Sequence, residues 1–565
     1  MSLEARVRPL LELLYPGRGE QVSAQVLALA ARHAPALAAR SAHPPLSERT
    51  AYLITYGDTV RRPGEAPLQT LAGLLREHVG DAVSDVHLLP IFPWTSDDGF
   101  AVVDHRQVDP GLGTWDDVTG LTAGHDVMLD FVANHVSAGS PWFEGWLADD
   151  PARAGFFLEQ DAEFDASRVV RPRTLPLFSD HVRPDGRPVR VWTTFGPDQV
   201  DVDVSTPAAL LELTDVLLGY LGRGASAVRL DAIGFLWKAS GTTCLHLPQT
   251  HAVVQLWRAL VDHLAPGALL LTETNVPHAE NISYFGDGTD EAHLVYQFAL
   301  PPLVLHSFVS GSTARLSAWA AGTGPVSPTA TFFTFLASHD GIGLRATEGI
   351  LTDAERQALV DRVRAHGGRV SMAAAADGGE RVYELNLSYL DALATPSQAR
   401  EPAVVAAKAI AAHSILLSVV GVPAVYVHSL LGSGPDLDGM RDSGIARRIN
   451  RAVLDADRLV EELRTDPRRS AVFSGLVALL RARQRQPALA PSSPQEVQVH
   501  DDRAFVVRRG SGDDVLVCAT NVTGEQVVLP GITGTDVLTG VAHSPLRLGP
   551  WGCAWVRPGR GRPDG

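Results

Sequence analysis

Short hydrophobic runs that end in polar residues recur along the chain from Ala51 to Val427, and a longer stretch with helical periodicity follows each of them. Runs that are apolar at nearly every position indicate strands buried on both faces, and strand–helix alternation favours a parallel sheet with right-handed crossovers. Eight such units predict an α/β protein built on a (β/α)8 TIM barrel. The runs are AYLIT (51–55), DVHLLP (85–90), DVMLDF (126–131), AVRLD (227–231), ALLLTE (268–273), VYQFAL (295–300), TFFTFL (331–336) and VPAVYV (422–427).

Two gaps between runs, after the third and after the seventh, are too long for simple crossovers. They predict inserted subdomains at 133–205 and 342–394, which leave 49–132, 206–341 and 395–487 for the barrel. Loops that follow the strands build the reactive face of this fold, so both inserts are expected to wall one pocket.

The two ends of the chain have textures of their own. Residues 1–48 are rich in Leu and Ala, are interrupted by Pro9, Pro16 and Pro35 and end at the loop-like HPPLSERT, which predicts a small helical extension. Residues 488–565 alternate short apolar runs with Gly, Asn and Pro, which predicts a C-terminal antiparallel β domain.

Composition excludes several classes of protein. Hydrophobic residues make up 45% of the chain and charged residues 20%, so a large core forms and wholesale disorder is excluded. The net charge of −16 argues against a nucleic-acid or membrane-surface partner, because both need a clustered basic face. The most apolar stretch, Ile410 to Val427, contains His413 and Pro423 and is interpreted as a buried helix running into a buried strand.

Cysteine content and the first residues bear on the compartment. Cys244, Cys518 and Cys553 are too few and too far apart for a disulfide framework or a CxxC metal site, which fits a reducing compartment. The opening MSLEARVRPL lacks the apolar core of a secretory signal, so a cytoplasmic protein is expected.

Polar and charged residues gather where several predicted strands end. Arg229 and Asp231 are two residues apart on one strand, so their side chains share a face, and the cation is expected to lower the pKa of Asp231 as suits a nucleophile. Glu273 follows an apolar run, and burial beside another carboxylate raises a carboxyl pKa, as suits a proton donor. Such a pair is what retaining glycoside chemistry needs, with Asp340 to support the oxocarbenium-like transition state. The alternative is a set of buried ion pairs that closes one end of the barrel.

Four ordered segments carry a family resemblance. DFVANH (130–135), VRLDAIG (228–234), TETN (272–275) and FLASHD (335–340) resemble the signature regions of the alpha-amylase clan, glycoside hydrolase family thirteen. Further segments are similar to the sucrose phosphorylase subfamily, and most of all to its glucosylglycerate phosphorylase branch. Those segments include LITYGD (53–58), HLLPIFPWTSDDGFAVVDH (87–105), RPRTLPLF (171–178), FLWKASGTTCLHLPQTH (235–251) and YELNLSYLDAL (383–393).

The resemblance implies roles for individual residues. It makes Asp231 the nucleophile, Glu273 the general acid/base and Asp340 the transition-state stabiliser of a double displacement that moves an α-glucosyl group to phosphate. Donor-glucose contacts are implied for Asp98, Phe100, His135, Arg229, His339 and Arg447, and less firmly for His105. Phosphate or acceptor candidates are Arg173, Phe235, Tyr383 and Glu384, with Lys238, Arg345 and Arg369 as weaker ones, for which a solvated surface charge is the alternative.

Departures from the subfamily patterns leave the acceptor open. Phe235 and the Val382, Tyr383, Glu384 triplet replace residues typical of sucrose phosphorylases, whereas Met372 and Ala373 depart from the glucosylglycerate branch. The preferred donor is 2-O-α-D-glucosylglycerate. The alternatives are sucrose, sucrose 6-phosphate or glucosylglycerol phosphorolysis, an α-glucosidase, and a non-catalytic member of the clan.

The reaction sets the expected partners. They are a small glucoside and inorganic phosphate, in a monomer or homodimer. No cofactor and no metal are expected in the reaction, since carboxylates supply both the nucleophile and the proton donor.

Overall fold

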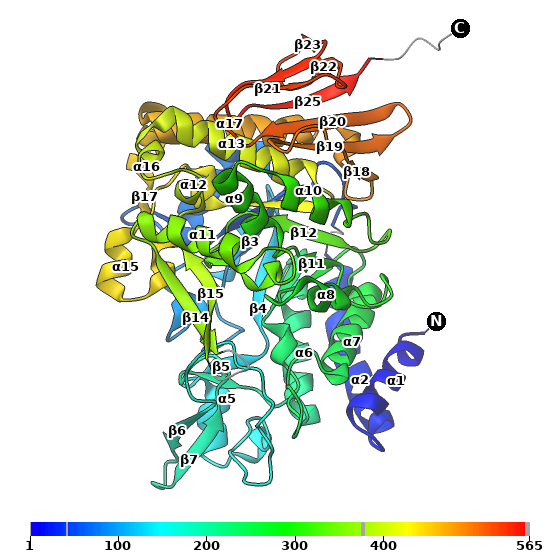
Figure 1. The fold of residues 1–565 in the computed structure, drawn as a ribbon. Helices are drawn as coiled ribbons and strands as arrows, with labels where there is room; N and C mark the ends of the chain where they lie inside the picture. Colours follow the sequence, from blue (N-terminus) through cyan, green and yellow to red (C-terminus); the bar gives the residue numbers. More distant parts are fainter. Residues whose placement is uncertain (1, 41–42, 375–378, 560–565) are drawn as a thin grey trace.

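Eight parallel strands close into a barrel in the computed structural model, which describes residues 2–40, 43–374 and 379–559 (Figure 1). The predicted TIM barrel is confirmed, and each predicted run overlaps a barrel strand. Around the barrel, the strands follow the order β1, β16, β12, β11, β10, β9, β4, β3. Their bounds are β1 Tyr52–Thr55, β3 Asp85–Leu88, β4 Asp126–Val132, β9 Ala227–Asp231, β10 Leu269–Thr272, β11 Leu294–Tyr296, β12 Thr331–Phe335 and β16 Val422–Tyr426.

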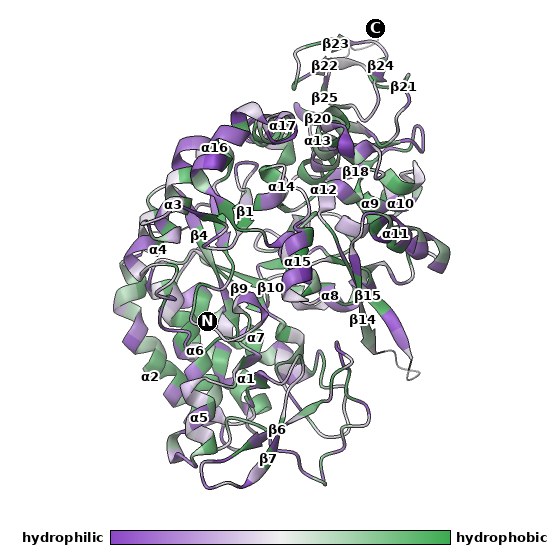
Figure 2. Cartoon of the chain, turned by 90° about the vertical axis from the view of Figure 1, so that its left-hand side faces the viewer, coloured by the Kyte–Doolittle hydropathy of each residue, from purple (hydrophilic) through white to green (hydrophobic). Residues whose placement is uncertain are grey.

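Helices cover the outside of the barrel. Several begin with proline in the first turn, where its missing N–H costs no hydrogen bond. The solvent side of the layer is polar, as α16 (Ala456–Thr465) shows in Figure 2. The main covering helices are α3 Pro67–Leu74, α4 Trp115–Thr122, α6 Pro207–Gly222, α7 Pro248–Leu264, α9 Leu300–Ser310, α10 Ala314–Ala321, α13 Pro402–Ser418 and α17 Pro467–Arg483.

Helix α13 and strand β16 together form the apolar stretch Ile410 to Val427, as predicted. Nearly every residue in the second half of α13 is buried, because the barrel lies on one side of it and the C-terminal sheet on the other. Among the described residues, no helix combines the length and the hydrophobicity needed to cross a bilayer.

Both predicted inserts contain their own small sheets. In the first, β5 (His135–Ser137) pairs with β8 (Gln199–Asp201), and β6 (Phe178–Val182) pairs with β7 (Pro188–Trp192) around helix α5 (Pro141–Leu147). The second holds α11 and a three-stranded sheet. Its members are β13 Ile342–Gly343, α11 Asp353–Ala365, β14 Arg369–Ala374 and β15 Glu380–Asn386.

The N-terminal extension consists of α1 (Leu3–Leu14) and α2 (Gly19–Ala38), which pack against α7 and α6. Val7 and Leu11 are fully buried in this contact.

The C-terminal part folds as a six-stranded antiparallel sheet beside the pair β21 and β24, and it lies over α13 and α17 at the top of Figure 1. One face of the sheet belongs to the main hydrophobic core, and the other face forms a small core with β21 and β24. Two polar contacts reinforce the junction: Trp555 Nε1 donates to Ser414 Oγ at 3.0 Å, and Arg509 Nη1 donates to the Ser418 carbonyl at 2.7 Å. The strands are β18 Gln495–Val497, β19 Ala504–Ser511, β20 Asp514–Asn521, β21 Val527–Leu529, β22 Gly534–Asp536, β23 Ala542–His543, β24 Leu546–Leu548 and β25 Cys553–Pro558.

The boundaries assigned to these units from the sequence stay predictions, and their residues 1, 41–42, 375–378 and 560–565 lie outside the described chain.

Candidate active site

Three carboxylates lie at the carboxyl ends of barrel strands and line one pocket. Asp231 is the last residue of β9, Glu273 directly follows β10, and Asp340 comes five residues after β12. Parallel strands in a closed barrel bring these ends to the same side. Residues of both inserts, among them Arg173 and Tyr383, complete the lining of this pocket.

Arg229 connects two of these carboxylates from beneath the pocket. Its Nη1 donates to Asp231 Oδ1 at 2.8 Å and to Asp130 Oδ1 at 2.7 Å, while Nη2 lies 3.9 Å from Glu273 Oε2. The backbone N–H of Ala232 also donates to Glu273 Oε2 at 3.0 Å. Ala232 has a φ of 48°, a left-handed conformation that is uncommon for alanine and that often marks functional sites. Asp231 and Glu273 are therefore held beside one shared cation.

Burial raises the pKa of both Asp231 and Glu273. For Asp231, Arg229 opposes the rise and the charge of Glu273 adds to it; for Glu273, Arg229 again opposes it and Asp340 adds to it. Arg229 lowers the pKa of Asp231 as expected, but the net pKa in the free pocket is raised, because the loss of water outweighs one cation that three carboxylates share. The prediction for Glu273 is confirmed in direction.

Asp340 has the opposite electrostatic setting. Burial acts to raise its pKa, but Arg447, His339 and Arg451 outweigh burial and hold the pKa of this carboxyl well below its usual range. Arg447 Nη1 lies 2.7 Å from Asp340 Oδ1, and its Nε and Nη2 donate to both oxygens of Glu384, at 3.1 and 2.7 Å. Asp340 is therefore a permanent anion, and Glu384 holds the arginine that faces it.

Aromatic and imidazole rings form an uncharged wall. Phe100 and His339 stack with centroids 4.8 Å apart and planes 4° from parallel. Burial lowers the pKa of His339 and of His135, so both imidazoles are neutral near pH 7. The His339 Nδ1 atom is buried and has no partner among the described residues, which leaves it free for a ligand hydroxyl.

Besides Arg369 and His105, three of the predicted residues do not line the pocket. Arg229 lies beneath its floor, as described above. Asp98 pairs with Arg448 and with Arg451 Nη1, whereas its neighbour Asp97 lines the cavity. The lining therefore favours Asp97 over the predicted Asp98 as the aspartate that meets a sugar.

Lys238 is the third. Its Nζ lies 3.0 Å from Asp201 Oδ2 and donates to Asn134 Oδ1, with 6% of the residue exposed. A cation that is already paired and lies behind the lining is a poor phosphate ligand, and its place in the structure is that of a buried ion pair.

Other predicted acceptor residues do face the cavity. Arg173 from the first insert lies over the ring of Tyr383 from the second insert, 5.5 Å from its centroid, and makes no hydrogen bond or ion pair with the described residues. Arg345 lines the same pocket; its buried Nε makes no hydrogen bond with the described residues and lies 3.9 Å from Glu348 Oε1. Phe235, Tyr383 and Glu384 also line the pocket, whereas Arg369 is exposed elsewhere and His105 is packed against Trp142.

The sequence analysis missed several residues at the site. Besides Asp97, the lining includes Gln199, whose Nε2 lies 3.2 Å from His135 Nε2, and Asn275, whose Oδ1 is buried without a partner. Asn275 stands in the TETN segment, so its signal was present. Gln199 begins QVDVDV (199–204), a segment that is also similar to the sucrose phosphorylase subfamily, but only the pairing of β5 with β8 shows that it reaches His135.

Comparison with known proteins agrees with this geometry. Residues 81–321 match the family described as "Alpha amylase, catalytic domain". A glucosylglycerate phosphorylase of Allomeiothermus silvanus is 47% identical over 90% of this chain and 91% of its own length. The chain belongs to the glycoside phosphorylases of the alpha-amylase family. A glucosylglycerate phosphorylase of Escherichia coli is 40% identical over 90% of this chain and 92% of its own length.

The fold of this chain is also similar to that of a solved phosphorylase structure. A sucrose 6F-phosphate phosphorylase from Thermoanaerobacter thermosaccharolyticum superposes with a TM-score of 0.73 at 25% identity, over 84% of this chain and 94% of the other. This enzyme family moves glucosyl groups between small glucosides and phosphate.

Proposed function

We propose that this phosphorylase transfers the α-glucosyl group of 2-O-α-D-glucosylglycerate to inorganic phosphate and yields α-D-glucose 1-phosphate with retained configuration. The observation that carries the proposal is the single pocket that holds Asp231, Glu273 and Asp340 around Arg229. The glucosylglycerate phosphorylases that are 47% and 40% identical to this chain supply the choice of donor.

The first step forms a covalent intermediate. An Asp231 carboxylate oxygen bonds to the anomeric carbon as the bond from that carbon to the glycerate oxygen breaks, and Glu273 gives its proton to that oxygen. Burial raises the pKa of Glu273, which favours the protonated form that this step needs. Asp340, held ionised by Arg447, stabilises the positive charge that develops on the sugar ring.

The second step reverses the roles. An oxygen of hydrogen phosphate attacks the anomeric carbon, the bond from that carbon to Asp231 breaks, and Glu273 takes the proton of the incoming hydrogen phosphate. Both carboxyl groups return to their starting states. Phe100 and His339 form a flat neutral platform for the sugar ring, and His135 and Asp97 are the polar groups beside it.

Phosphate in place of water needs cations that are not already neutralised. Arg173 fits this need, since it makes no ion pair with the described residues and stacks on Tyr383 at the pocket. Arg345 is the second candidate, because its buried Nε makes no hydrogen bond with the described residues and its ion pair with Glu348 is long, at 3.9 Å. Either guanidinium also suits the carboxylate of glycerate, which is an anion of similar geometry.

An acceptor panel tests the proposal in the synthetic direction. The enzyme receives α-glucose 1-phosphate with D-glycerate, glycerol, fructose or fructose 6-phosphate, and phosphate release is measured. We expect release with D-glycerate to exceed the others. Phosphate release with fructose but not with D-glycerate would assign the protein to sucrose phosphorolysis. Glucose release that is as fast without an acceptor as with one would indicate an α-glucosidase.

A nucleophile variant separates an enzyme from a non-catalytic relative. Asp231→Asn keeps the size of the side chain and removes the attacking charge, so we expect it to abolish glucosyl transfer. Unchanged transfer would remove Asp231 from the mechanism.

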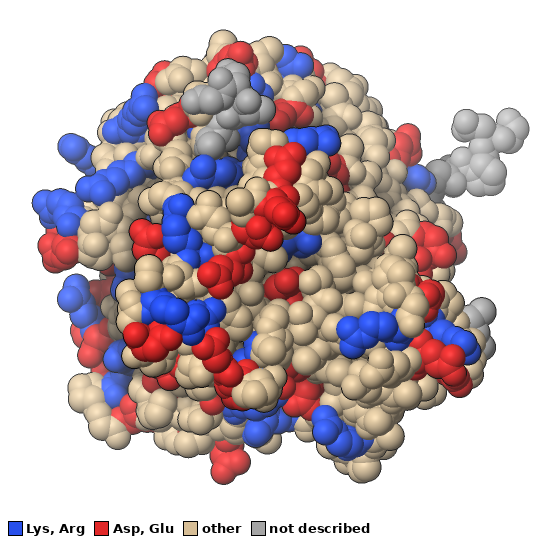
Figure 3. Space-filling model, turned by 90° about the horizontal axis from the view of Figure 1, so that it is seen from below, with Lys and Arg blue, Asp and Glu red and all other residues tan. Residues whose placement is uncertain are grey.

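The location of the reaction belongs to the proposal as well. Cys244, Cys518 and Cys553 are all free thiols, which supports a reducing compartment such as the cytoplasm. On the face drawn in Figure 3, acidic and basic side chains are interspersed, which supports small molecules over nucleic acid as partners. A monomer or homodimer stays a prediction.

A further inference from the structure

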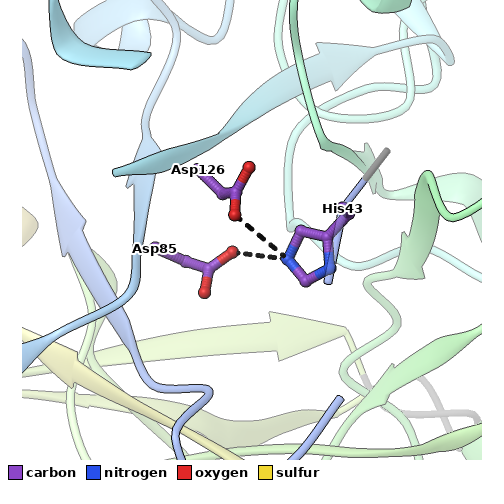
Figure 4. Close-up of side chains that lie close together, drawn as sticks. All are labelled: His43, Asp85 and Asp126. Carbon is purple, nitrogen blue, oxygen red and sulfur yellow. Dashed lines mark hydrogen bonds and ion pairs between the residues drawn. The ribbon is translucent and has the colours of Figure 1, made fainter. Parts of the chain in front are cut away.

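A second polar cluster lies at the opposite end of the barrel from the pocket. Tyr52, Asp85 and Asp126 are the first residues of β1, β3 and β4, and they stand in register across these neighbouring strands. The amino ends of the strands form the far face of the barrel from the active site. His43, from the segment before β1, points its Nε2 at both aspartates (Figure 4).

The imidazole is oriented as a metal ligand is oriented. His43 Nδ1 contacts the Pro44 carbonyl at 2.5 Å, an arrangement that fixes the proton on Nδ1 and turns the Nε2 lone pair the other way. Nε2 lies 2.8 Å from Asp85 Oδ1 and 3.9 Å from Asp126 Oδ2. The second oxygen of Asp85 accepts from Ser84 Oγ, so only Oδ1 is free to face the histidine.

Three electron-rich atoms that face one another need a cation between them. A proton on Nε2 satisfies Asp85, but it does not satisfy Asp126 at 3.9 Å. The Tyr52 side chain is fully buried beside the cluster, since Tyr52 stands in register with Asp85 on the neighbouring strand. A proton on Nε2 therefore leaves Asp126 Oδ2 without a hydrogen bond from the histidine.

A divalent cation fits the donor set. Zn²⁺ takes one imidazole nitrogen and two carboxylate oxygens at about 2.0–2.2 Å, so that its ligands lie roughly 3.4 Å apart, between the two distances seen here. With neutral His43, the two aspartates carry the charge that such an ion balances. The Asp126 side chain is 37% exposed, which leaves a route for the ion and a position for a water. Arg40 and His125 are the other charged or titratable groups that act on Asp126, and their positive charge opposes a cation.

We propose that His43, Asp85 and Asp126 form a divalent transition-metal site, suited to Zn²⁺, that ties the segment after the N-terminal helices to the amino ends of β3 and β4. This site is independent of the glucosyl chemistry. Residue spacing gave no sign of it, because the ligands come from three separate parts of the chain.

Zinc binding to the full-length protein tests the proposal directly. The protein is stripped with a chelator, and titration calorimetry with ZnCl₂ is combined with metal analysis after dialysis. We expect one Zn²⁺ per chain and a rise in Tm on binding. His43→Gln and Asp126→Asn are each expected to weaken binding by at least about tenfold, since changes outside the ligand shell already cost that much.

The matched control is Asp116→Asn, which changes an exposed aspartate in the first turn of α4. It is expected to bind as the unchanged protein does. Co²⁺ gives a second readout, because a site of this kind shows d–d absorption that is lost in both variants. Circular dichroism checks that the variants fold; if one does not, the other carries the test.

Three results would overturn the inference. The stripped protein binds no Zn²⁺, or His43→Gln and Asp126→Asn bind Zn²⁺ as tightly as the unchanged protein, or Asp116→Asn loses as much affinity as those two variants. The first would leave a protonated His43 as the only cation in the cluster. Glucosyl transfer by His43→Gln is expected to stay within about twofold of the unchanged enzyme, so a failure of this site leaves the proposed reaction untouched.

Discussion

Glu384 acts on the reaction through Arg447. Its carboxylate takes two hydrogen bonds from that guanidinium, whose third nitrogen faces Asp340. Glu384→Gln removes the charge but keeps the shape, and losing a hydrogen bond to a charged group costs about 1.5–3 kcal/mol. We expect kcat to fall about 10- to 100-fold with every acceptor.

The KM values separate this positioning role from direct acceptor binding. A positioning residue lowers kcat and leaves the KM of D-glycerate within about twofold, whereas a residue that binds the acceptor raises that KM and spares kcat. Glu380→Gln, an exposed change on the same strand, is the control and is expected to have no effect. Unchanged kcat in Glu384→Gln would contradict the role given to Glu384.

The pH dependence follows from the two raised pKa values at the pocket. Glu273 must be protonated and Asp231 ionised in the free enzyme, so kcat/KM falls as pH rises through the pKa of Glu273 and as pH falls through that of Asp231. Because burial raises both, both limbs are expected above the ordinary values of 4.5 and 3.8. A pH profile of kcat/KM measures them.

Glu273→Gln assigns the alkaline limb. With an aryl α-glucoside, whose leaving group needs no proton, the variant is expected to form the intermediate without that limb. An alkaline limb that persists would belong to another group.

At the scale of elements, the two inserts meet where Arg173 lies over Tyr383. Arg173→Ala removes a cation that no carboxylate of the described chain neutralises, and we expect kcat/KM for phosphate to fall about 10- to 100-fold while hydrolysis gains relative to phosphorolysis. Initial rates of glucose 1-phosphate and glucose formation measure the two outcomes. Arg171→Ala, on the same segment but outside the lining, is the control; equal effects would show a general change of the insert.

The N-terminal helices stabilise the barrel from outside. Leu11 of α1 is fully buried where this helix packs against its neighbours, α2 and α7, whereas Leu13 of the same helix is 50% exposed. Leu11→Ala is expected to lower the free energy of unfolding by about 2–5 kcal/mol, and Leu13→Ala by no more than about 0.5 kcal/mol. Urea unfolding measures both. A similar cost for the two variants would mean that α1 contributes little through this contact.

Across the whole molecule, the sequence predicted what periodicity and strand order control. The eight strands follow from apolar runs, and the three carboxylates follow from their place after those runs. The choice between Asp97 and Asp98 was beyond the pattern, because both have φ values near 50° in an irregular turn. Lys238 was misplaced because its partner, Asp201, comes from a distant insert. The pKa of Asp231 depends on how far water is excluded, which no residue spacing reveals.

The position of α13 has a consequence for truncation. Helix α13 packs against the barrel on one side and against the C-terminal sheet on the other. Removing the chain from β18 onward would therefore expose an apolar face of α13 to water. A shortened enzyme ending near residue 488 should therefore precipitate or recruit chaperones, even though every reacting group remains on it. Among the described residues, the C-terminal strands contribute none to the pocket lining, and activity is expected to depend on them only through the stability of the barrel.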